Sequence, residues 1–192
     1  MISLDFFTKG PPGEHTRYIV RKYTDPLVQT ILEDVNTFSL KKEVQIKSLS
    51  QLYNLILCVE AEIKPHCEKI LRSVVYKLIL DDEPELRGRT QKIAELLGLF
   101  VTTDFVFPMV LTHLNDIESR STPRYVSSVL TALSAVIKHS SIRFGEQFQG
   151  HMDRLIELII SSDYLESDNL DVLDKVLKVT QNCVIAAGQK YG

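Results

Sequence analysis

Adjacent histidine and cysteine side chains are the first candidates for chemistry in this sequence, because both residue types bind zinc. His66 and Cys67 are neighbours, but no second pair follows at a spacing that would complete a four-ligand site. The remaining histidines are scattered along the chain: His15, His113, His139 and His151. We therefore predict no metal site, and we assign these histidines to the surface or to packing contacts.

Motifs for nucleophilic or phosphate chemistry are absent from the sequence as well. The Gly10-Pro11-Pro12-Gly13 segment lacks the GxxxxGK[ST] spacing, and its two prolines remove backbone N–H donors that a phosphate would need. No GxSxG motif is present, and carboxylates gather only at residues 81–85 and 163–174, where turns and helix caps are expected. The sequence predicts a protein that is not an enzyme, with no catalytic residue and no cofactor.

Composition limits the compartment and the class of partner. The 192 residues are 44% hydrophobic and 24% charged, with a net charge of −3, which gives no reason to expect nucleic acid or an anionic membrane as a partner. The three cysteines form no CxxC pair, and no apolar run approaches the roughly 20 residues of a membrane span. We expect a soluble, cytoplasmic protein with reduced thiols.

An internal repeat organises the chain. Its clearest copy covers residues 64–101, where a helix is followed by the acidic turn at residues 81–85 and by a second helix. The first helix carries an apolar stripe formed by Ile70, Val74, Val75, Leu78 and Ile79. Pro84 cannot continue the first helix because it lacks an N–H, but it is well tolerated in the first turn of the second. The pattern predicts a helix, a short turn and an antiparallel helix.

The same unit recurs at helical positions about 39 to 46 residues apart. First helices are expected over residues 26–35, 66–80, 105–114 and 147–160. Second helices are expected over residues 42–62, 86–100, 125–138 and 170–187. Periods of about 40–47 residues are typical of HEAT and armadillo units, and the expected third helix of an armadillo unit is missing. We predict an all-α fold, an α-solenoid of about four HEAT-type antiparallel helix pairs.

The expected boundaries place a flexible tail at residues 1–13 and the solenoid at residues 14–192. The helices over residues 42–62 and 170–187 are apolar around much of their circumference, so neither has the polar outer face of a terminal repeat. The solenoid is therefore expected to be a section of a longer array.

Local signals predict where several helices begin. Asp25, Thr103-Asp104 and the segment from Ser167 to Asn169 are expected N-caps. Pro108 lies one turn inside the third first helix, where it either kinks the helix or marks a later start.

The turn Asp81-Asp82-Glu83-Pro84-Glu85-Leu86-Arg87 resembles the signature turn of a HEAT repeat. In that family an acid and an arginine of neighbouring repeats often bond along the stack. The resemblance implies a structural ladder built from Asp81, Asp82, Arg87 and Arg89 rather than a binding site.

Polar stripes on the second helices mark the expected partner surface, since solenoids commonly bind partners on that side. The stripe residues are Lys47, Gln51, Asn54, Arg89, Lys92 and Glu95. No aromatic ladder or concentrated basic run accompanies them, which disfavours single-stranded nucleic acid. We predict that a protein partner is held by this mixed-charge surface.

A wider resemblance covers roughly residues 40–187. The segments AELLGLFV at 94–101, TDFVF at 103–107, VLTHL at 110–114, VLTALSAV at 129–136 and ESDNLD at 166–171 resemble the HEAT-repeat axonemal dynein assembly factor family. That resemblance implies a cytoplasmic factor for preassembly of the dynein arms of motile cilia. It also implies dynein chains, chaperones and other assembly factors as partners, without catalytic or cofactor residues.

Two other HEAT classes remain open at this level. A nuclear-transport or phosphatase-scaffold array has similar units. A tubulin-binding TOG module usually offers a tryptophan and basic turns, whereas this chain has no tryptophan and an acidic best turn.

Overall fold

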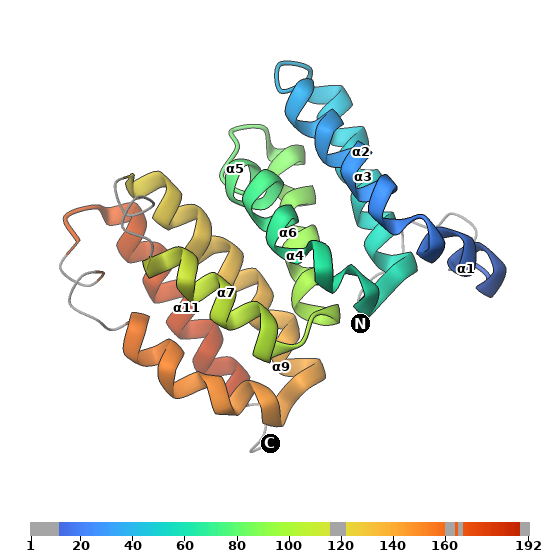
Figure 1. Ribbon diagram of the computed structural model, residues 1–192. Coiled ribbons are helices and arrows are strands. Elements are labelled where there is room, and N and C mark those ends of the chain that lie inside the picture. The colour runs from blue at the N-terminus through green and yellow to red at the C-terminus, as the bar shows by residue number, and fades with distance from the viewer. Residues whose placement is uncertain (1–11, 116–121, 160–163, 165–166, 189–192) are drawn as a thin grey trace.

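The computed structural model of the protein describes residues 12–115, 122–159, 164 and 167–188. Every element within these residues is helical. Figure 1 shows the helices as successive pairs stacked side by side from the N-terminal to the C-terminal end of the chain. The prediction of an all-α solenoid of about four helix pairs is confirmed.

The first two pairs contain uninterrupted second helices. The first pair is α2 (Thr24–Thr37) with α3 (Lys42–Val59). In the second pair, the first helix is built from α4 (Cys67–Ile70), a π-helical turn η2 (Leu71–Val75) and α5 (Tyr76–Leu78), and the second helix is α6 (Pro84–Phe100). Pro84 occupies the first turn of α6, as its missing N–H predicts.

The third and fourth pairs are joined through a kinked helix, α9 (Pro123–Ile159), which supplies one segment to each pair. They consist of α7 (Thr103–Asn115), α9 and α11 (Leu170–Gly188). The two helices expected over residues 125–138 and 147–160 are confirmed as the two segments of α9, which meet at a kink where Phe144 has the non-helical φ −116° and ψ 26°. No proline lies between Pro123 and Ile159, so the chain changes direction at a kink beside Gly145 instead of leaving the helix.

The core is one continuous apolar layer between and within the pairs. The helix α3, which is apolar around most of its circumference, buries residues on several sides because α2 and α6 pack on either side of it. The stripe predicted for the second pair is buried in full: Ile70, Val74, Val75, Leu78 and Ile79. Helical periodicity therefore identified the core correctly here.

The N-terminal end differs from its prediction. The helix expected over residues 42–62 stops at Val59, because Glu60 has φ 54° and ψ −119° and a short 3₁₀ helix η1 (Glu60–His66) follows. An additional helix α1 (Glu14–Lys22), which the sequence pattern did not predict, is held against η1 by ion pairs. Residues 1–11 of the expected tail lie outside the described residues.

One predicted N-cap is confirmed. The Oδ1 atom of Asn169 accepts hydrogen bonds from the backbone N–H groups of Asp171 (3.0 Å) and Val172 (3.3 Å) at the start of α11. The Ser167 hydroxyl in turn accepts from the N–H of Asn169 at 3.3 Å. These bonds satisfy donors that a helix N-terminus otherwise leaves unpaired.

Two other predicted caps are wrong. Asp25 lies inside α2, which begins at Thr24, and its carboxylate is paired elsewhere. The hydroxyl of Thr103 is buried without a hydrogen-bond partner, and the first amides of α7 bond to the carbonyl of Thr102. Because α7 begins at Thr103, Pro108 lies within the helix and does not mark a late start.

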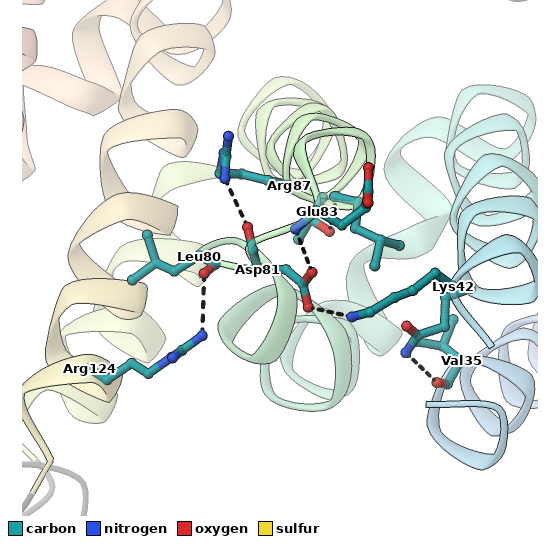
Figure 2. A network of polar contacts seen from close by, with 10 residues as sticks. Val35, Lys42, Leu80, Asp81, Glu83, Arg87 and Arg124 are labelled. Atoms are coloured by element: carbon teal, nitrogen blue, oxygen red, sulfur yellow. Dashed lines mark hydrogen bonds and ion pairs between the residues drawn. The ribbon is translucent and has the colours of Figure 1, made fainter. Parts of the chain in front are cut away.

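The turn between α5 and α6 connects three helix pairs (Figure 2). Asp81 Oδ2 lies 2.8 Å from Lys42 Nζ of the preceding pair, and Asp81 Oδ1 accepts the Glu83 N–H at 2.9 Å. From the following pair, Arg124 donates to the carbonyl of Leu80 at 3.3 Å.

The predicted ladder therefore exists with altered members. Arg87 donates to the backbone carbonyl of Asp81 within the same turn, at 2.9 Å, and Asp82 is exposed. A lysine replaces the expected arginine on the Asp81 carboxylate. Burial tends to raise the pKa of Asp81, but the hydrogen bonds from Lys42 and Glu83 and the charges of Lys42 and Arg124 lower it overall.

One glycine allows two helices to approach closely. A Cβ atom at Gly98 of α6 would lie 2.3 Å from the carbonyl oxygen of Val136 in α9, and 2.8 Å from its Cα. Those are backbone atoms that cannot rotate away. The Ser140 hydroxyl of α9 also donates to the Gly98 carbonyl at 2.9 Å, so backbone and side chain meet at this crossing.

Replacing Gly98 by alanine is expected to lower the free energy of unfolding by about 1–3 kcal/mol, because the two helices must move apart. Gly88 on the same helix has nothing within 4 Å of a built Cβ, so Gly88→Ala serves as the matched control. It should raise stability by about 0.5–1 kcal/mol through helix propensity. Urea unfolding of both variants measures the difference; equal shifts would contradict the close packing.

The Asp81–Lys42 contact predicts a pH dependence of stability. Since the folded pKa of Asp81 is below its ordinary 3.8, the contact contributes fully above pH 3.8 and is lost as pH falls through the lowered value. Asp81→Asn keeps an acceptor for the Glu83 N–H but removes the charge, and should cost about 0.5–1 kcal/mol at neutral pH.

Thermal unfolding of wild type and Asp81→Asn between neutral pH and pH 3 measures this difference. The gap between the two proteins should narrow below pH 4 and should also shrink in high salt. A gap that stays constant down to pH 3 would show that the charge of Asp81 contributes nothing.

Candidate functional site

The described residues contain no group of three or more His, Cys, Asp and Glu side chains that could hold a metal ion. Cys67 is fully buried, and burial raises the pKa of its thiol to about 12, so it stays protonated and is a poor nucleophile or ligand. Its neighbour His66 is paired with a carboxylate. No described helix is long and apolar enough to cross a bilayer.

Four of the five histidines, His66, His113, His139 and His151, lie at contacts between neighbouring helix pairs. His66 Nε2 is 2.8 Å from Asp25 Oδ1, and His151 Nε2 is 2.7 Å from Asp104 Oδ1. The two contacts join equivalent parts of successive first helices. His113 is buried and bonded to the preceding pair. These residues act in packing, as the sequence predicts.

The structure divides the six predicted partner-binding residues into two groups. Arg89 and Glu95 are half-buried and engaged in contacts between second helices. Lys47, Gln51 and Lys92 are exposed, and Asn54, on the same face of α3 as Gln51, is half-buried and lines a groove together with it. Two of the six residues therefore hold helices together, and the other four lie at the surface.

Arg89 connects α6 to α3. Its guanidinium donates to the Ser50 hydroxyl of α3, and its Nη2 lies 2.7 Å from Glu85 Oε1, one turn earlier on α6. Holding the guanidinium between two helices fixes their relative position. This contact joins neighbouring helix pairs and holds α3 and α6 in a fixed relative position.

Glu95 connects α6 to α9 in the same way. Its Oε1 lies 3.4 Å from Lys138 Nζ, and its Oε2 lies 3.5 Å from His139 Nε2. Burial tends to raise the pKa of Glu95, but contact with His139, the charge of Lys138 and the hydrogen bond from Gln91 lower it overall. Glu95 is therefore a charged carboxylate that joins α6 to α9, and not a proton donor.

A groove of about 480 Å³ lies at the N-terminal end of the stack, between α1, α2 and α3. We call it the terminal groove. Its apolar wall is formed by Val20, Leu27, Ile31, Leu55 and Cys58. Its polar rim is formed by Thr30, Asp34, Gln51 and Asn54. Of the predicted surface, only Gln51 and Asn54 contribute to it.

Sequence reasoning missed the α1 and α2 side of this groove. One signal was present: Leu27 is apolar but lies outside the core stripe of Val28, Leu32 and Val35 on the same helix. An apolar residue beside a core stripe marks a second face that needs cover. The α1 wall had no such signal because that helix buries no residue fully.

Comparison with known proteins agrees with this architecture. The sequence model of the family described as dynein axonemal assembly factor 5, HEAT-repeat domain, matches residues 8–192. No solved structure matches the chain.

Two relatives share the same description. Dynein axonemal assembly factor 5 of Xenopus laevis is 28% identical over 152 residues, which cover 79% of this chain and 17% of the relative. The Mus musculus protein of that name is 26% identical over 160 residues, covering 78% and 18%. The chain thus spans less than a fifth of the length of these relatives. Because the family model matches residues 8–192, which include every helix described above, the chain belongs to the dynein axonemal assembly factor 5 family, in its HEAT-repeat domain.

Proposed function

We propose that this chain is a non-catalytic, protein-binding scaffold that acts in the cytoplasmic preassembly of axonemal dynein arms. Family membership supports the link to dynein assembly. The partners we propose are axonemal dynein chains, together with chaperones and other assembly factors. Because the chain corresponds to less than a fifth of its relatives, it would supply one part of the scaffold.

The observation that carries the proposal is that polar contacts hold the second helices together. Arg89 and Glu95 tie α3, α6 and α9 together through contacts with Ser50, Lys138 and His139. A surface held in this way needs little ordering when a partner binds, and preorganisation improves affinity. Catalysis, in contrast, would need groups placed around a reacting centre, and these residues are occupied in holding helices.

The proposed contact residues follow from this division. Lys47 on α3 and Lys92 on α6 lie on the second helices and are exposed, with Gln51 beside the first of them. Two lysines on a rigid face suit an acidic partner segment, since rim charges mainly direct the encounter and its specificity. Arg89 and Glu95 would support this surface from within.

We also propose that the helix stack continues beyond α11 in a longer array. That helix exposes Leu170, Leu177 and Val184 at seven-residue intervals, with Ile185 beside them. The corresponding inner helix α6 is covered by α3 on one side and by α9 on the other, whereas α9 covers α11 on one side. A further helix pair would bury this stripe as the inner interfaces do.

Charge reversal at Lys47 and Lys92 together (Lys47→Glu, Lys92→Glu) is expected to reduce recovery of dynein intermediate and heavy chains roughly tenfold in pull-downs from ciliated cells. Lys69→Glu on α4 is the control for a single lysine-to-glutamate change, because Lys69 is an exposed lysine on the first-helix side. Circular dichroism should show all variants folded. Unchanged dynein recovery, or recovery of importin cargo or phosphatase catalytic subunits instead, would overturn the proposal.

The α11 stripe gives a second prediction. In the isolated chain, Leu177→Gln with Val184→Gln should change stability by less than about 0.5 kcal/mol, because both side chains are about two-thirds exposed. In a chain extended by the segment that follows in the full-length protein, the same two substitutions should lower the free energy of unfolding by about 2–4 kcal/mol. Thermal unfolding measures both, and an equal effect in the two chains would argue against a covering repeat.

A further inference from the structure

We propose that the terminal groove docks a single amphipathic helix of a protein partner, one that carries an apolar stripe flanked by basic residues. The inference rests on the proposed protein-binding function and deepens it by naming the class of partner segment. The groove is lined by Gln51 and Asn54 of α3 and by residues of α1 and α2, and it includes neither Lys47 nor Lys92.

The floor and walls of the groove are apolar. Leu27 of α2, one of the lining residues, is an apolar side chain that is 39% exposed. Contiguous exposed apolar side chains rimmed by polar residues mark interaction surfaces. The volume of about 480 Å³ would accommodate several aliphatic side chains of one helix face.

Two acceptors in the rim lack partners among the described residues. The Oδ1 atom of Asn54 is buried without a hydrogen bond, and a buried acceptor in that state favours any occupant that brings a donor. The carboxylate of Asp34 faces the same groove, and no described cation pairs with it. Both groups accept, and one is negatively charged, so the complementary occupant carries lysine or arginine.

The end face admits one helix rather than a stacked pair. The helix α1 already stands against η1 at this end, held by Arg17 Nη1 to Glu60 Oε1 at 2.7 Å and by Arg21 Nε to Glu62 Oε1 at 3.3 Å. Val20 of α1 forms one wall of the groove. A complete helix pair stacked here would have to displace α1.

The backbone at Glu60 supports this placement of α1. Its φ of 54° is strained for a residue with a side chain, and such conformations persist where the surroundings over-determine them. The conformation ends α3 and places the Glu60 carboxylate against Arg17. The strained Glu60 thus helps to hold α1, which forms one wall of the groove, against the first helix pair.

Two synthetic helix-forming peptides test the proposal on the whole chain. Both carry leucines at positions i, i+3, i+4 and i+7, and they differ only in having lysines or glutamates beside the stripe. Calorimetry should show that the lysine peptide binds at least tenfold more tightly than the glutamate peptide, as expected for one charge-assisted hydrogen bond in the rim.

Matched variants locate the site. Leu27→Glu should abolish binding, and Asp34→Asn should remove most of the preference for lysine. Glu33→Gln makes the same charge change at the next residue, which bonds to Gln29 and does not line the groove, so it should leave binding unchanged. Ile142→Glu on α9, at a side chain 66% exposed, is the control for loss of a surface apolar group.

Several outcomes would overturn the proposal: equal binding of both peptides, binding that survives Leu27→Glu, or an equal loss in Glu33→Gln. A dimer in sedimentation that Leu27→Glu dissociates would also overturn it, since the occupant would then be a second copy. Failure of both peptides while dynein chains are still recovered rejects the groove proposal alone. Lysine-peptide binding without dynein recovery supports the groove and rejects the proposed dynein partner.

Discussion

Apolar surface on both sides of each helix pair is the constraint on which this molecule depends. A helix such as α3, apolar around most of its circumference, cannot be exposed to water, so α2 and α6 must cover it. The same requirement then applies to α6 and α9. Each pair is stable only with its neighbours in place, which is the logic of a quasi-one-dimensional array. At α11 this requirement leaves an exposed apolar stripe.

Polar contacts give the stack its register. They join residues about one repeat apart: Lys42 with Asp81, separated by 39 residues, Asp25 with His66 by 41, and Asp104 with His151 by 47. Because most of these contacts are partly exposed, each contributes modestly to stability. Their effect is to select one arrangement of the pairs among several that would bury similar apolar area.

The two ends of the stack differ for physical reasons. At the C-terminal end, α11 presents a regular apolar stripe that another helix pair could cover. At the N-terminal end, a strained residue, Glu60, terminates α3 and pairs with Arg17, so that α1 stands beside the first pair. The result is a groove with an apolar wall and unpaired acceptors in place of a flat stacking face.

The sequence by itself determined the all-α class, the period of about 40 residues, the buried stripe of the second pair, the start of α6 at Pro84 and the cap at Asn169. Those features depend on residues within one or two helical turns of each other, where spacing and backbone chemistry decide the outcome. Tertiary structure decided the rest. The kink at Phe144 that joins two expected helices, the contacts of Arg89 and Glu95 between helices, and the groove at Asn54 all depend on residues about 40 positions apart or on elements brought together by packing. A polar stripe looks the same in sequence whether it meets solvent, a partner or the next helix, and only the position of the neighbouring pair distinguishes them.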